Sequence, residues 1–230
     1  YEALAAGRDD VSIEQVDGGT STRQDSLVVR IEGVETPEET VILGSHLDSI
    51  AMVAFFFPDS VAPGADDNAS GTATNLEIFR ILMENDIRPR RSLEIHAYAA
   101  EEIGLIGSKT LARKYASEGR NVTSMVQFDM TLFRRGREDI IWFVTNNTNE
   151  QLTDDLAGFA DQYLSIPWGK KQLMAGTSDH QSWHDRGFVA AFPTENPTEY
   201  NQNIHTREDT LETSGISWTQ AREFAKLGVA

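Results

Sequence analysis

The sequence contains no cysteine. It can therefore form no disulfide or thiolate zinc site, and it has no thiol nucleophile. Basic residues are also scarce, with 20 Lys and Arg against 36 Asp and Glu and a net charge of −16. Because nucleic acids and anionic membranes attract basic surfaces, we expect neither as a partner. No apolar run approaches the roughly 20 residues that span a bilayer, so we expect no membrane segment.

The remaining composition is typical of a globular protein. The chain has 230 residues, 40% of them hydrophobic, which is enough for one domain with a real core. It shows no internal repeat or low-complexity tract, so we expect a single domain over residues 1–230. Strand-like and helix-like patterns alternate along most of its length. This predicts an α/β fold whose mixed, mostly parallel central sheet has helices on both faces.

The stretch from residue 41 to residue 71 is central to the argument. An apolar run, Val41–Ser45, leads into His46, and Asp48 follows two residues later. Such a run is typical of a buried parallel strand, whose carboxyl end is where ligands bind in open α/β sheets. The acidic pair Asp66 and Asp67 comes next, before a predicted helix that Asn68 would cap.

Two more predicted strands end in acidic residues. The strand over residues 92–100 runs into Glu101 and Glu102, and the strand over residues 122–128 runs into Asp129. Each group alone has an ordinary explanation as a helix cap or a solvated surface. Because the carboxyl ends of parallel strands meet at one edge, we expect these side chains to converge near His46. Histidine and carboxylate groups are zinc ligands, so the sequence predicts a metal site at this edge.

The residue set suits a pair of zinc ions. Two ions about 3.5–4 Å apart need a bridging carboxylate and terminal ligands. The predicted ligands are His46, Asp66, Glu102, Asp129 and His205, and if Asp66 bridges, each ion receives one histidine, one terminal carboxylate and the shared aspartate. Glu101 stays off the metals as the general base and acid. Asp48 would accept the second ring N–H of His46 and fix its tautomer.

Six motifs carry a resemblance to a known family. GSHLDS, APGADDNASG, AYAAEEIGLIGS, FDMT, SDHQSWHDRG and IHTREDTL occur in this order. Together they resemble the secreted zinc-dependent aminopeptidases of the bacterial leucyl aminopeptidase type, from about Val11 to the end. The resemblance implies two zinc ions bridged by Asp66, with His46 and Asp129 on one and Glu102 and His205 on the other. It also implies a cis peptide bond between Asp66 and Asp67.

The resemblance extends to the substrate and the setting. It implies hydrolysis of the first peptide bond of peptides with a free N-terminus, and preference for large apolar first residues such as Leu. Four residues match positions of the apolar substrate pocket: Met130, Phe192, Tyr200 and Ile204. It further implies a secreted, monomeric enzyme. The chain begins later than family members do, so we expect a domain truncated at its N-terminal side.

The chain departs from the family pattern around residue 175. Leu173 and Thr177 match positions that are often joined by a disulfide. Ala175 matches a tyrosine that helps to hold the tetrahedral intermediate, so the zinc ions alone or another donor such as Tyr200 would take that role. In the long connection before Asp66, Phe55, Phe56 and Phe57 stand together. We expect them to pack on the core rather than line a pocket.

Other functions remain open at this stage. A zinc carboxypeptidase on the same scaffold would need a cation for the substrate carboxylate, and Arg134, Arg135 and Arg207 are the nearest candidates. A glutaminyl cyclase-like enzyme would use a single zinc ion. A receptor-like module that has lost the chemistry would be expected to lose ligands first, whereas all the predicted ligands and Glu101 are present.

Overall fold

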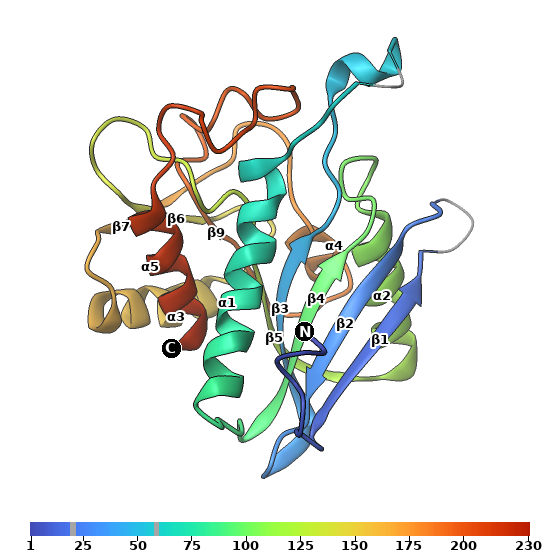
Figure 1. Cartoon of the computed structure of the whole chain (residues 1–230). Helices are drawn as coiled ribbons and strands as arrows, with labels where there is room; N and C mark the ends of the chain where they lie inside the picture. Colours follow the sequence, from blue (N-terminus) through green and yellow to red (C-terminus); the bar gives the residue numbers. More distant parts are fainter. Residues whose placement is uncertain (19–21, 58–59) are drawn as a thin grey trace.

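The computed structural model describes residues 1–18, 22–57 and 60–230, and its central feature is a six-stranded sheet (Figure 1). The strand order is β1 (Val11–Asp17), β2 (Asp25–Ile31), β4 (Arg91–Tyr98), β3 (Thr36–His46), β5 (Asn121–Gln127) and β8 (Ala190–Ala191). A smaller sheet has the order β7 (Trp168–Lys171), β6 (Ile141–Val144) and β9 (Pro193–Thr194).

The main sheet is mixed, as the sequence predicts. Strand β3 runs parallel to both β4 and β5, and β5 runs parallel to β8. Strands β1 and β2 form an antiparallel edge, so the predicted hairpin pairing is confirmed. Its predicted turn begins at Asp17 and Gly18, but it extends to residue 19, which lies outside the described residues.

Helices cover both faces of the sheet (Figure 1). One layer holds α1 (Gly71–Glu84), α3 (Glu150–Tyr163) and α5 (Trp218–Val229), and the other holds α2 (Ile106–Glu118) and α4 (His180–His184). Neighbouring strand residues point to opposite layers, since Leu43 packs in the first and Ile42 in the second. None of these helices combines the length and the apolar character that a membrane crossing requires.

The register of the parallel strands positions the site. His46, the last residue of β3, pairs with Tyr98 at the end of β4, and Gly44 pairs with Gln127 at the end of β5. The segments that follow β4 and β5 therefore leave the sheet beside His46. This arrangement brings Glu101, Glu102 and Asp129 to one edge, as expected for parallel strands.

The phenylalanines of the long connection behave differently from the prediction. Phe56 and Phe57 are 83% and 69% exposed, so the expectation that they pack on the core is wrong for both. The side chain of Phe55 lies outside the described residues. The short 3-10 turn Met52–Phe55 is attached to the site through a main-chain bond from Met52 N–H to the carbonyl of His205, 2.9 Å long.

Candidate metal centre

His46 anchors the first of two groups of potential metal ligands. Its side chain is 1% exposed, and its Nδ1 lies 3.0 Å from the carbonyl oxygen of Asp48. Since a carbonyl only accepts, Nδ1 donates and Nε2 is turned inward. Nε2 lies 3.1 Å from Asp67 Oδ1 and 3.5 Å from Asp129 Oδ2. All three side chains are buried, and they form a compact set of one nitrogen and two carboxylates.

His205 anchors the second group. Its Nε2 lies 2.9 Å from Glu102 Oε2 and 3.0 Å from Asp67 Oδ2. His205 is about one-third exposed, whereas His46 is sealed in the interior. The backbone of His205 has a φ of 59°, in the left-handed region that non-glycine residues seldom adopt. This loop residue is therefore held in an uncommon conformation that directs its ring toward the carboxylates.

Asp67 belongs to both groups. One of its carboxylate oxygens faces His46 and the other faces His205, which is the arrangement that a bridging ligand requires. The prediction that Asp66 takes this place is therefore wrong by one residue. In the turn Ala65–Ser70, Asp66 points the other way. Its Oδ1 accepts the N–H of Leu132 at 3.1 Å.

The backbone of this turn also differs by one residue from the expectation. The cis peptide bond joins Asp67 and Asn68 rather than Asp66 and Asp67. The N-cap position of α1 is Ser70 rather than the predicted Asn68. Asn68 still supports the start of the helix, because its Oδ1 accepts the N–H of Gly71 at 2.9 Å.

Asp48 supports the site in a way that the sequence did not indicate. Its carboxylate lies 3.6 Å from the His46 ring, so the carbonyl of Asp48 is the closer acceptor. The carboxylate instead accepts the N–H of Glu101 at 2.9 Å and that of Glu102 at 3.1 Å. One residue thus orients the His46 ring and holds the turn that presents the two glutamates.

The titration of the histidines reflects the density of negative charge. Burial lowers the pKa of His46, but the charge of Asp129 and the hydrogen bonds that the ring donates to neighbouring carboxylates raise that pKa well above the usual range. Hydrogen bonds to Asp67 and Glu102 raise the pKa of His205 to about 10. Burial alone would raise the pKa of Asp67, but its bonds to the two histidines lower it.

Two carboxylate oxygens test whether the residues fit a cation. Glu102 Oε1 and Asp129 Oδ1 are buried, and neither has a hydrogen-bond partner among the described residues. A buried acceptor without a partner costs free energy, about 1–3 kcal/mol and more when it is charged. A cation in each group would satisfy both oxygens. Nitrogen and carboxylate donors also match the preference of zinc, so the residues present fit zinc ions.

Glu101 stands beside the two groups without belonging to either. Burial raises the pKa of its carboxyl well above the usual range, and the nearby acidic residues Asp179, Asp129 and Asp67 add to the rise. The side chain lines a cavity of about 230 Å³ that also adjoins Glu102 and His205. A carboxylate at the edge of a cation site, free to take up a proton, has the properties of a general base.

The same cavity contains the predicted substrate residues. Met130, Phe192, Tyr200 and Ile204 all line it. Leu173, Ala175 and Thr177, the positions at which the chain departs from the family pattern, lie in the same wall. Because Ala175 brings no hydroxyl, this wall is mostly apolar near the turn 173–177.

Sequence reasoning missed several buried polar residues around the ligands. Ser178 Oγ donates to Asp129 Oδ2 at 2.6 Å, and Gln127 Nε2 donates to Asp179 Oδ2 at 3.1 Å. Burial raises the pKa of Asp179 to about 7. The signal for Ser178 and Asp179 was the motif SDHQSWHDRG, which supported the resemblance without being assigned a role. Glu195 and Asp209 are two further buried acids: Glu195 accepts the N–H of Phe133, and Asp209 accepts the N–H groups of Asp66 and Asp67.

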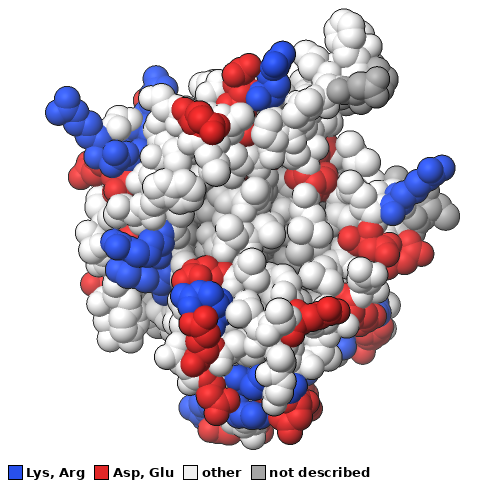
Figure 2. Space-filling view, in the orientation of Figure 1, with Lys and Arg blue, Asp and Glu red and all other residues white. Residues whose placement is uncertain are grey.

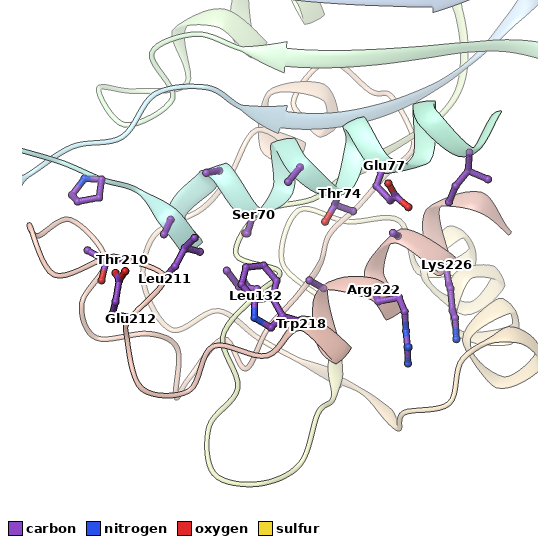
Figure 3. Close-up of a pocket in the computed structure, with 17 residues that line it drawn as sticks. Ser70, Thr74, Glu77, Leu132, Thr210, Leu211, Glu212, Trp218, Arg222 and Lys226 are labelled. Carbon is purple, nitrogen blue, oxygen red and sulfur yellow. The ribbon is translucent and has the colours of Figure 1, made fainter. Parts of the chain in front are cut away.

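A larger cavity lies away from these groups, between α1 and α5. Its volume is about 890 Å³, and its lining includes Ser70, Thr74, Leu132 and Trp218 (Figure 3). Uncharged atoms dominate the middle of this face of the molecule, and charged side chains lie mainly around it (Figure 2). None of the ligand residues lines this cavity. Size alone therefore does not select the candidate site, because the smaller cavity beside Glu101 is the one that adjoins the two groups of potential ligands.

Fold and site together define the class of protein. It has an α/β fold with two adjoining histidine and carboxylate groups at the carboxyl edge of its parallel strands, as metal-dependent hydrolases do. The sequence pattern of peptidase family M28 matches residues 26–230. The chain belongs to peptidase family M28.

Individual relatives agree with this membership. The chain is 38% identical over 229 residues to a probable aminopeptidase of Saccharomyces cerevisiae, covering 96% of this chain and 60% of that protein. It is 36% identical to leucine aminopeptidase 1 of Trichoderma harzianum, covering 97% of this chain and 56% of that one. The crystal structure of the LapA aminopeptidase of Legionella pneumophila superposes with a TM-score of 0.89 at 31% identity, covering 99% of this chain and 59% of that one. The chain thus spans about three-fifths of the length of these relatives.

Proposed function

We propose that this protein is a zinc-dependent aminopeptidase that removes large apolar residues from the N-terminus of peptides. One observation carries the proposal: the Asp67 carboxylate lies between His46 and His205, with Glu101 beside it and an apolar cavity adjoining. His46, Asp67 and Asp129 would hold one zinc ion, and Asp67, Glu102 and His205 would hold the other. The aminopeptidase names of the relatives support the same activity.

The protein's own residues divide the work. Zinc ions in the two groups would supply charge that polarises the scissile carbonyl and lowers the pKa of water. Glu101 takes a proton from the attacking water while the oxygen of that water bonds to the carbonyl carbon. As the carbon–nitrogen bond breaks, Glu101 delivers that proton to the leaving amine. Asp48 keeps Glu101 in place through the Glu101 N–H, so the base is held on a fixed turn.

The charge of the site supports recognition of a free amine. Asp67, Glu101, Glu102 and Asp129 all line the cavity. A substrate ammonium group, or the amine that it becomes at the site, finds acceptors on every side there. An acetylated N-terminus has no charge to offer and adds bulk beside the ligands. We therefore expect cleavage to depend on a free N-terminus.

The size of the cavity supports a preference for apolar first residues. Its volume of about 230 Å³ suits a single side chain, and Met130, Phe192 and Ile204 present apolar surface to it. Burying one leucine-sized side chain stabilises a complex by about 1.5–3 kcal/mol relative to leaving it in water. A negatively charged first residue would lose solvation without gaining an ion pair, because no Lys or Arg is among the described residues that line the cavity.

A carboxypeptidase is the less suitable alternative. It would need a cation to bind the carboxylate of the substrate, and no Lys or Arg is present among the described residues that line the cavity. The earlier candidates Arg134, Arg135 and Arg207 are not among them. This composition favours recognition at the amine end of a peptide.

The direct test is hydrolysis of leucine p-nitroanilide by the zinc-loaded protein, compared with N-acetyl-leucine p-nitroanilide. We expect release of p-nitroaniline from the free amine only, and loss of that release after chelation with restoration by zinc. Cleavage of both substrates would contradict amine recognition. Failure to cleave either, or cleavage that survives complete removal of metal, would contradict the proposed function.

A further inference from the structure

Asp209 is a buried carboxylate that contacts the backbone of the proposed bridging ligand. It is 1% exposed. Its Oδ2 accepts the N–H of Asp67 at 3.1 Å, and its Oδ1 accepts the N–H of Asp66 at 3.2 Å. Oδ1 also accepts a hydrogen bond from Nδ2 of Asn201 at 3.1 Å. The carboxylate therefore has three donors, two of which belong to the turn that carries the bridge.

The position of Asp209 in the chain connects this turn to His205. Asp209 follows His205 by four residues, within the same loop. Its own carbonyl accepts the N–H of Ala65 at 3.1 Å, so main chain and side chain together hold the start of the turn. Figure 1 shows the C-terminal loops beside the start of α1, where this contact is made. The segments that carry Asp67 and His205 have no strand in common, and Asp209 joins them directly.

The two proposed zinc groups differ in how their other ligands are held. His46 ends a central strand, and Asp129 follows another strand and is bonded to Ser178. His205 lies in a loop without regular structure. The distance between His205 and Asp67 therefore depends on contacts between loops, and Asp209 makes three of these contacts, with the N–H groups of Ala65, Asp66 and Asp67.

We propose that Asp209 is a positioning residue that sets the distance between Asp67 and His205 and thereby the affinity of the group Asp67, Glu102 and His205 for its zinc ion. This inference rests on the proposed zinc chemistry. Charge-assisted hydrogen bonds to backbone N–H groups are stronger than neutral ones, so a carboxylate holds this turn more firmly than an amide can. In Asp209→Asn, one acceptor becomes an NH₂ group facing backbone donors, and the turn loses at least one bond.

The test is competitive zinc titration of the whole chain against a chromophoric chelator, which resolves the two dissociation constants. Residues that orient metal ligands are typically worth about 10–100-fold in metal affinity. We expect Asp209→Asn to weaken one zinc ion by about this factor and the other by much less. The control is Glu208→Gln, which removes the same charge one residue earlier from a side chain that is 69% exposed. It should leave both constants unchanged.

Two results would overturn the inference. One is an Asp209→Asn protein that binds both ions as the parent does. The other is an equal loss at both ions, which would indicate a merely structural role. A His205→Ala background sharpens the test, because the zinc ion that Asp67, Glu102 and His205 would hold has then lost its histidine ligand and is expected to be absent. There, adding Asp209→Asn should leave the affinity for the remaining ion nearly unchanged.

A measurement on the parent chain covers the case in which Asp209→Asn fails to fold. Hydrogen exchange of the metal-free protein should show strong protection of the Asp66 and Asp67 amides. Exchange of the Asp67 amide as fast as that of exposed amides would mean that the bond to Asp209 is not maintained, and the inference would fail. Because none of these measurements uses a peptide substrate, failure of the aminopeptidase assay alone would not affect them.

Discussion

Buried acidic side chains occur in two clusters, one on strand β4 and one just beyond its end, and the clusters differ in the partners that the chain supplies. In the first, Glu94 is 1% exposed and is surrounded by donors. Its carboxylate accepts from Arg30 at 2.7 Å, Arg120 at 3.3 Å, the Tyr115 hydroxyl at 2.7 Å and His96 Nε2 at 2.9 Å. Every charge in this cluster has a partner supplied by the chain itself.

The second cluster begins at Glu101 and Glu102, a few residues beyond the end of the same strand. Asp67, Asp129 and Glu102 are held there with two histidines, and no Lys or Arg among the residues described forms an ion pair with these three carboxylates. Two of their buried oxygens lack any partner. The cluster thus concentrates negative charge where the chain supplies too little positive charge.

The comparison indicates which cluster needs a cation from outside. Burying an ionised carboxylate costs several kcal/mol unless it is paired or bound to a metal. Around Glu94 the guanidinium groups already meet this cost. Around Asp67 the two histidines offset only part of this cost, and two buried carboxylate oxygens have no partner among the described residues. This is the physical reason to assign metal binding to one acidic cluster and stability to the other.

The strongest test of this contrast replaces one carboxylate oxygen by an NH₂ group in two neighbouring residues, Asp67 and Asp66. Asp67→Asn should reduce the bound zinc from two ions to one or none, because an amide cannot bridge two cations. Activity should fall by more than the roughly 10–100-fold typical of a residue that only orients a ligand. Asp66→Asn, with the same change one position earlier, should keep both ions. Zinc content measured by atomic absorption, alongside leucine p-nitroanilide turnover, checks both variants.

The opposite result would exchange the roles of the two aspartates. If Asp66→Asn lost zinc and Asp67→Asn retained it, the bridging role would return to Asp66. The geometry makes this outcome unexpected, because Asp66 Oδ1 accepts the N–H of Leu132 and Asp66 belongs to neither group of potential ligands. Burial raises the pKa of Asp66 to about 7.

The difference between Asp66 and Asp67 also marks the limit of sequence reasoning. That His46, Glu102 and Asp129 converge follows from strand order, because parallel strands deliver their last residues to one edge. Which of two adjacent aspartates faces that edge depends on the dihedral angles of an irregular turn. No periodicity of the side-chain pattern reports on those angles.

Long-range contacts were equally invisible from the sequence. Asp209 contacts Asp67 across 142 positions of the chain, and Asp48 contacts the N–H of Glu101 across 53. Asp48 was predicted to support His46 with its carboxylate, whereas its carbonyl is the closer acceptor. Composition likewise could not show that Phe56 and Phe57 stay exposed, since the same residues in a loop of another shape would pack on the core.

The second test separates metal binding from proton transfer, the role proposed for Glu101. Glu101→Gln preserves the shape of the side chain and removes its ability to take a proton. Loss of a general base typically costs about 10²–10⁴-fold in rate, so we expect kcat to fall within this range with both zinc ions retained. Parallel measurement of kcat and zinc content checks this expectation. Turnover that survives the substitution would mean that Glu101 is not the base, and loss of zinc would place it among the ligands.

The smallest effect is expected at the satisfied cluster. Glu94→Gln should leave zinc content and kcat unchanged and lower the free energy of unfolding by about 1–3 kcal/mol, the usual cost of removing one partner from buried polar groups. Urea unfolding of the zinc-saturated parent and variant measures the difference. A variant that lost zinc without losing stability would reverse the assignment of the two clusters.

The pH dependence of that difference provides a second check. Burial alone would raise the pKa of Glu94, but hydrogen bonds from His96, Tyr115 and Arg30 outweigh it and lower the pKa to about 2. Because the folded-state pKa lies below the ordinary value of 4.5, the stabilisation is complete above pH 4.5 and is lost as the pH falls toward 2. In the metal-free proteins, the stability difference between parent and Glu94→Gln should therefore shrink as the pH falls from 5 to about 3. A difference that stayed constant over this interval would show that the ionised form of Glu94 is not what stabilises the fold.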